Sequence, residues 1–209
     1  MRTRAIVIAL VLCISFLPSA QAGQLEQLDD VGAVFGGVHV AANESGNATS
    51  TLSTLPTIAE DYTATWCENC VYVEHALDEV EETSSMQQYH FHRFIGESED
   101  PFGTQEGDDR WTDRYDDRLA PTVVFNGTIR QIGSTPIGDS LVEDFTTNVE
   151  QELDLGQGSS TLGWIPASNE SNATVTWALV INQSMIPDNG SIKSMIWIVE
   201  QTGHFAEGG

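Results

Sequence analysis

Basic side chains are scarce in this chain of 209 residues. Eight lysines and arginines stand against 31 aspartates and glutamates, which gives a formal net charge of -23 at pH 7. Nucleic acids and anionic membrane surfaces are both bound through clustered lysine and arginine side chains. The composition therefore predicts that the protein binds neither of them.

Long apolar runs are missing after the N-terminus. Residues 1–22 contain two arginines, thirteen mostly apolar residues from Ala5 to Leu17, and the small-x-small sequence Ala20-Gln21-Ala22. This pattern is typical of a secretory signal cleaved after Ala22. The apolar run is shorter than the ~20 residues that span a bilayer, so a retained anchor is the less favoured alternative. We expect an extracytoplasmic protein (secreted, periplasmic or at the cell surface) without stable membrane insertion after cleavage.

Cysteine is also rare. Of three cysteines, Cys13 lies in the signal segment, which leaves Cys67 and Cys70 in a mature chain of 31 acidic and 6 basic residues, or -25. The C-x-x-C spacing occurs in redox-active pairs, in half-sites for zinc and in static disulfides, so spacing alone leaves these alternatives open. The acidic surface fits either a saline habitat or an extracellular protein kept soluble by self-repulsion.

Asparagine is concentrated in glycosylation sequons. Seven of the nine asparagines after the signal segment stand in N-x-S/T sequences. The two alternatives are a secreted composition rich in serine, threonine and asparagine, and glycosylation of these sites. Asn126 is the least favoured because it adjoins a predicted strand. The other candidates are Asn43, Asn47, Asn169, Asn172, Asn182 and Asn189.

The pattern of apolar residues divides the mature chain into three regions. Residues 23–55 form an N-terminal arm, expected to be a short strand or packed segment to residue 40, and then a polar linker or long loop. Residues 56–157 alternate strands and helices and predict an α/β domain. Residues 158–209 predict a β-rich region with strands at 161–165, 172–182 and 192–201. Three strands seldom form a stable unit alone, so we expect them to pack on the α/β unit, pair with another chain, or continue in a sandwich beyond Gly209.

Within residues 56–157 the expected elements follow one another closely. Residues 57–63 predict a strand that runs into a helix opening at the two cysteines, with Val73, Leu77 and Val80 inward. Residues 89–95 predict a second strand. Residues 107–119 predict a helix that buries one aromatic stripe and exposes a stripe of three arginines. The inward residues are Trp111, Tyr115 and Leu119, and the expected solvent-facing arginines are Arg110, Arg114 and Arg118.

The last part of this region predicts a hairpin and a helix. Residues 122–125 and 128–133 flank Asn126-Gly127, a dipeptide that favours a tight hairpin turn. Ser140 and Glu143 have the spacing of a capping box, which predicts a helix that continues to Gly156. Its inward residues are Leu141, Phe145 and Val149.

This order of elements resembles the thioredoxin-like superfamily across residues 56–157. The motif Trp66-Cys67-Glu68-Asn69-Cys70 stands at a strand-to-helix junction, Ala120-Pro121 falls in the place of the cis-proline loop, and Asp61 precedes Cys67 by six residues. The stretch EDYTATWCENC is similar to thioredoxin-like domains of outer-membrane and envelope proteins that append a β-rich domain. The helix that the family places before the first core strand is not evident.

The resemblance implies a division of roles. Cys67, at a helix N-terminus, is the expected nucleophile, because unpaired N–H groups and the helix dipole favour its thiolate. Cys70 then attacks the mixed disulfide, and Asp61 accepts its proton. The residues expected to contact substrate are Trp66, Ala120 and Pro121.

Glu68 and Asn69 replace the Gly-Pro of reducing thioredoxins and are expected to tune the potential. Glu68 opposes thiolate formation at Cys67, and the nearest basic residue in sequence, Arg93, is twenty-three positions beyond Cys70. A less stabilised thiolate favours the disulfide form, so we expect a reductase or isomerase rather than a disulfide donor.

Two histidines offer a weak signal for a metal site, as an alternative to redox chemistry at the cysteines. The sequence His90-Phe91-His92 on a strand would point both rings to one face, but two ligands do not close a metal site, so no metal is expected. His39, His75 and His204 receive no role.

We therefore predict an extracytoplasmic thiol-disulfide oxidoreductase that acts on protein disulfides with a redox partner and without a cofactor. The alternative is a non-catalytic surface glycoprotein that uses the same fold as an interaction module with a static disulfide.

Overall fold

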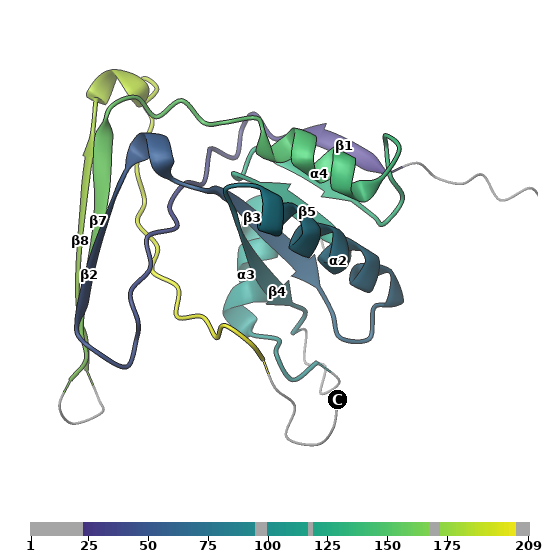
Figure 1. The fold of residues 1–209 in the computed structure, drawn as a ribbon, viewed down its shortest axis with the longest axis horizontal. Helices are drawn as coiled ribbons and strands as arrows, with labels where there is room; N and C mark the ends of the chain where they lie inside the picture. Colours follow the sequence, from purple (N-terminus) through teal and green to yellow (C-terminus); the bar gives the residue numbers. More distant parts are fainter. Residues whose placement is uncertain (1–22, 95–99, 117–118, 168–171, 204–209) are drawn as a thin grey trace, which may run out of the picture.

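A computed structural model describes residues 23–94, 100–116, 119–167 and 172–203, which form two β-sheets and three α-helices (Figure 1). The predicted signal segment, Arg118, Asn169 and His204 lie outside these ranges. Among the residues placed by the structure, no helix is both long enough and apolar enough to cross a bilayer.

The larger sheet has five strands in the order β1-β6-β5-β3-β4. Its strands are β1 (Gln24–Gln27), β3 (Thr57–Thr63), β4 (Met86–His92), β5 (Thr122–Phe125) and β6 (Ile129–Ile132). β3 and β4 are parallel, and the other neighbours are antiparallel. The helices are α2 (Glu68–Thr83), α3 (Gln105–Tyr115) and α4 (Leu141–Val149). The predicted order of elements from residue 57 to residue 149 is confirmed.

The larger sheet separates two cores. On one face, α2 and α4 pack against the strands, and α3 covers the other face (Figure 1). Successive strand residues point to opposite faces, so Ala59 belongs to the first core and Tyr62 to the second. The predicted inward residues of α2 and α4 are buried, as are Trp111 and Tyr115 of α3.

Several predicted boundaries were wrong. β4 begins three residues before the expected position, and the arm forms its strand at β1 rather than farther along the chain. α3 ends at Tyr115 because Asp116 adopts a left-handed backbone conformation with φ 49°, which leaves Leu119 outside the helix and exposed. α4 ends at Val149 rather than Gly156, although Ser140 caps it as predicted by accepting a hydrogen bond from the backbone N–H of Glu143 at 3.1 Å.

The smaller sheet consists of β2 (Gly46–Thr51), β7 (Gly158–Ile165) and β8 (Thr174–Ile181), paired antiparallel in that order. β7 and β8 were predicted. β2 lies in the segment expected to be a linker, so that expectation was wrong. Its small polar residues carry no strand signal, but β7 supplies backbone partners from more than a hundred positions away, for example Ala48 opposite Leu162.

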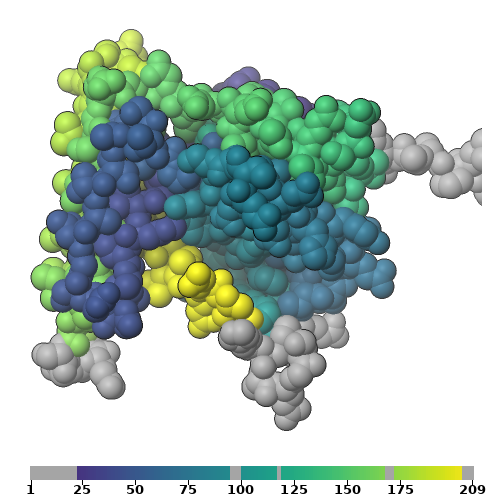
Figure 2. Space-filling view, viewed as in Figure 1, coloured from purple at the N-terminus to yellow at the C-terminus, as the bar shows by residue number. Residues whose placement is uncertain are grey.

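Residues 192–201 do not form the predicted third strand. This C-terminal segment instead lies between the two sheets and crosses the β4 and α3 side of the larger one (Figures 1 and 2). The ring centroid of Trp197 lies 4.9 Å from that of Tyr89 and 5.4 Å from that of Phe91, both on β4. Aromatic contacts, rather than backbone pairing, therefore anchor the segment.

Candidate functional site

Cys67 and Cys70 form a disulfide at the start of α2, with their Cα atoms 5.3 Å apart. β3 is buried along its whole length and ends at Thr63, and the backbone N–H of Cys67 then donates to the carbonyl of Ala64 at 2.9 Å. Cys67 is the N-cap residue of α2 and is partly exposed, whereas Cys70 is only 1% exposed. The arrangement leaves Cys67 partly exposed to solvent and encloses Cys70.

Asp100 fixes the turn that leads into the disulfide. Its buried carboxylate accepts a hydrogen bond from the backbone N–H of Thr65 at 2.8 Å and pairs with His92 Nδ1 at 3.1 Å. The other carboxylate oxygen accepts from the backbone N–H of Phe102 at 3.2 Å. Sequence reasoning missed Asp100, whose only local signal is the Asp-Pro dipeptide of a turn.

Trp66 is 47% exposed beside Cys67, and the guanidinium of Arg93 lies 5.9 Å from the centre of its ring. The backbone N–H of Arg93 donates to the carbonyl of Thr63 at 3.1 Å, which brings this residue from the end of β4 to the end of β3. Arg93 is remote from Glu68 in sequence, but the fold brings its guanidinium to the ring of Trp66, the residue before Cys67. Glu68 and Asn69 are both exposed in the first turn of α2.

The Ala120-Pro121 peptide bond is cis, as the resemblance implied. Pro121 is buried and its carbonyl accepts a hydrogen bond from the backbone N–H of Gly133 at 2.9 Å, whereas Ala120 is half-buried. The exposed side chain of Leu119 precedes this bond.

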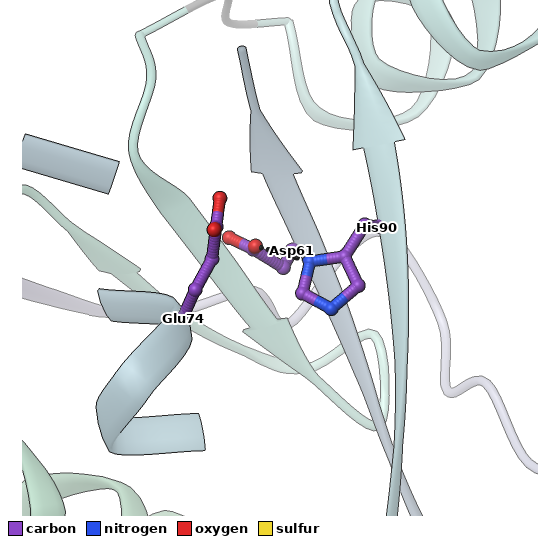
Figure 3. A group of neighbouring side chains, drawn as sticks. All are labelled: Asp61, Glu74 and His90. Carbon is purple, nitrogen blue, oxygen red and sulfur yellow. Dashed lines mark hydrogen bonds and ion pairs between the residues drawn. The ribbon is translucent and has the colours of Figure 1, made fainter. Parts of the chain in front are cut away.

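Asp61 is fully buried on the face of β3 that α2 covers. Its Oδ2 lies 2.8 Å from Nδ1 of His90, and the two residues are direct partners in the parallel register of β3 and β4 (Figure 3). Its Oδ1 has no hydrogen-bond partner among the residues that the structure places. Burial raises the pKa of Asp61 above its ordinary value, and the hydrogen bond and charge of His90 offset part of that rise. Asp61 is thus a buried carboxyl group with a raised pKa, and its Oδ1 is buried without a hydrogen-bond partner in the described ranges.

Three side chains offer ligand atoms within 4.8 Å of one another: Asp61, Glu74 and His90 (Figure 3). Asp61 and His90 contact each other, and Glu74 accepts a hydrogen bond from Thr63 Oγ1 at 2.6 Å. Each member therefore already has a protein partner. His92 pairs with Asp100 instead, so the two strand histidines do not converge on one ion.

The opposite face of β3 carries a second buried acid, Glu60. Arg110 Nε donates to Glu60 Oε1 at 2.6 Å, a second guanidinium nitrogen reaches the same oxygen, and the Tyr115 hydroxyl donates to Oε2. Arg114 Nε donates to the Tyr115 hydroxyl at 3.0 Å. The prediction that Arg110 and Arg114 face solvent was wrong. Arg110 pairs with the buried Glu60, and Arg114 donates hydrogen bonds to the Tyr115 hydroxyl and to the carbonyl of Gly32.

The glycosylation candidates within the described ranges differ in exposure. Asn126 is buried, and its side-chain oxygen accepts from the backbone N–H of Ile58 at 2.9 Å. Exposed sequon asparagines are Asn43, Asn47, Asn172, Asn182 and Asn189.

A scan against protein-family models gave no match, and a search of curated proteins also found none. The class of protein therefore follows from the structure alone. It is a mixed α/β protein with a C-x-x-C disulfide at a helix N-terminus and a buried carboxylate on the preceding strand.

Proposed function

We propose that the protein is an extracytoplasmic thiol-disulfide oxidoreductase with a thioredoxin-like unit at residues 56–157. The observation that carries the proposal is the asymmetry of the disulfide, in which Cys67 is partly exposed and Cys70 is buried. The parallel β3–β4 pair, the hairpin of β5 and β6, and the cis Ala120-Pro121 bond agree with the resemblance. The smaller sheet agrees with the envelope type that appends a β-rich region.

The reaction begins with the reduced pair. The Cys67 thiolate, stabilised by the N–H groups of the first turn of α2, attacks one sulfur of a substrate disulfide and releases the other as a thiolate. Cys70 then attacks the Cys67 sulfur of the mixed disulfide. The second substrate sulfur leaves, the substrate has gained two electrons, and the internal disulfide is restored.

The second attack requires that Cys70 lose its proton. Asp61 is the proposed acceptor because burial favours its protonated form and its Oδ1 has no protein partner in the described structure. Glu60 is excluded from this role because its two carboxylate oxygens accept hydrogen bonds from Arg110 and Tyr115 on the other face of β3.

Exposed apolar side chains near the disulfide favour a polypeptide substrate. Trp66 precedes Cys67, Val71 and Tyr72 follow Cys70 on α2, and Leu119 precedes the cis bond. An extended chain that lies along this surface would place its own disulfide over Cys67. The direction of electron flow is proposed to be that of a reductase or isomerase.

The test is trapping of a mixed disulfide. Reduced Cys70→Ser is expected to form a lasting mixed disulfide through Cys67 with insulin, because attack is retained and resolution is lost. The wild-type chain is expected to reduce insulin catalytically, and Cys67→Ser should neither trap nor reduce it. Trapping by Cys67→Ser alone would reverse the two roles. A wild-type pair that no dithiol reduces under native conditions would instead indicate the static-disulfide module.

A further inference from the structure

His90 joins a buried acid to the surface of the protein. Asp61 has no exposed surface, whereas the side chain of His90 is 34% exposed and touches Asp61 through Nδ1. The contact is set by the backbone, since these residues are partners in the register of β3 and β4. The second ring nitrogen of His90, Nε2, makes no hydrogen bond to any residue within the described ranges. His90 therefore has one nitrogen on the acid and one available to water.

The charges around this pair are mainly negative. Glu74 and Asp78 face His90 from α2, Asp61 faces it from β3, and His92 is the titratable neighbour on β4 that acts on Asp61. Burial opposes the charged ring, but the hydrogen bond and charge of Asp61 prevail and raise the pKa of His90 above its ordinary value. The pKa values of both partners are therefore raised, and each group holds its proton more tightly than it would in water.

We propose that His90 is the group through which the proton taken from Cys70 is exchanged with solvent, so that the resolution step depends on the protonation of His90. The inference rests on the proposed redox function, because it concerns the same site. His90 does not touch the reacting sulfurs, and it acts as a positioning residue through Asp61.

The step conserves protons and electrons. Cys70 gives its proton to the Asp61 carboxylate, and its sulfur forms a bond to the Cys67 sulfur as the Cys67–substrate bond breaks. The substrate sulfur leaves with the electron pair. Neutral Asp61 then gives its proton to Nδ1 of His90, and the ring releases its Nε2 proton to water. The Asp61 carboxylate is restored, and His90 again holds one ring proton.

Histidine suits this position because it has two ring nitrogens and titrates near neutral pH. A lysine in its place would supply the positive charge but would stay protonated throughout the neutral range. A glutamine would supply a hydrogen bond without any charge. These differences define the variants for a test.

The test is a pH series of single-turnover reactions between the reduced protein and 5,5′-dithiobis(2-nitrobenzoate), with EDTA present. Attack by Cys67 releases the first thionitrobenzoate and attack by Cys70 releases the second, so the two steps appear as two phases. His90→Gln is expected to slow the second phase about tenfold near neutral pH and to remove its inflection, while the first phase is unchanged. His90→Lys should also lack the inflection. His75→Gln, an exposed histidine on α2, is the matched control and should behave as wild type.

The outcomes separate this proposal from the proposed function. A wild-type protein with no first phase overturns both. A wild-type protein with both phases, and a His90→Gln variant that keeps the wild-type pH profile or slows both phases equally, overturns the role of His90 alone. A second measurement needs no variant: the ring nitrogens of His90, followed by NMR, should titrate at a different pH in the oxidised and the reduced protein. Identical titrations would overturn the coupling of His90 to the dithiol.

Discussion

Glu60 and Asp61 are consecutive acids on β3, and both are fully buried. Their carboxylates point to opposite faces of the strand and have different hydrogen-bond partners there. Glu60 meets Arg110 and Tyr115, which donate hydrogen bonds to both of its oxygens. Asp61 meets one titratable, half-exposed partner and retains an oxygen without a protein partner. Two equally buried acids thus differ in their partners. Arg110 keeps its charge, whereas the charge of His90 changes with pH.

The two faces of the sheet are also covered by different elements. The guanidinium of Arg110 lies 4.9 Å from the ring centre of Trp197, so the C-terminal segment covers the Glu60 face. On the Asp61 face, α2 carries the disulfide at its N-terminus and Glu74 along the same side. The Glu60 face holds a paired, fixed charge covered by the C-terminal segment, and the Asp61 face holds a pair that includes a titratable histidine.

The largest expected effect comes from removing the fixed partner of Glu60. Arg110→Met should lower the free energy of unfolding by about 3–5 kcal/mol, because a buried carboxylate would lose its counter-charge. Chemical denaturation of the oxidised protein measures the loss. Glu60→Gln combined with Arg110→Met should recover most of it. If the double variant is as unstable as Arg110→Met, packing of the arginine side chain rather than charge is what matters.

A smaller effect is expected at Asp61, and it depends on pH. The pKa values of Asp61 and His90 are both raised in the folded protein, so folding binds protons and stability falls as pH rises through the folded pKa values. Asp61→Asn removes the acid and the cause of the shift at His90. The decline in unfolding free energy between about pH 6 and about pH 9 should therefore be smaller in this variant than in the wild type.

Denaturation curves of the oxidised protein at both pH values provide this measurement. Glu60→Gln is the control for a neighbouring buried acid, and it should not reproduce the flattened pH dependence. An Asp61→Asn variant with the wild-type slope would show that the Asp61–His90 pair does not titrate differently on folding.

The smallest expected effect concerns the C-terminal segment, residues 192–201, which covers the Glu60 face. Trp197→Ala removes the ring contacts to β4 and the cation contact to Arg110, and we expect a loss of about 1 kcal/mol. Cleavage by a protease within residues 192–201 should become faster while thiol chemistry at Cys67 stays unchanged. Trp177→Ala, an exposed tryptophan on β8, is the matched control. Equal protection of the segment in both variants would contradict an anchoring role for Trp197.

The comparison also shows where sequence patterns succeed. Val73, Leu77 and Val80 predicted the buried side of α2 because helix periodicity is a local property. Asn126-Gly127 predicted the hairpin because only a few residue pairs accept positive φ at both turn positions, here 48° and 70°. The prediction of a strand at residues 192–201 was wrong. A short apolar run indicates that a segment is buried or in contact, but it does not identify the backbone partner that a strand needs.

The sequence by itself determined the position of the C-x-x-C motif at a strand-to-helix junction, the acid six residues before it, and the proline that follows Ala120. These features are encoded in adjacent residues. The tertiary structure decided that Asp61 meets His90, that Glu60 meets Arg110, and that β2 pairs with β7. Each of these contacts joins residues at least twenty-nine positions apart, and local propensity carries no information about strand register or about the charge that a helix turns toward a sheet.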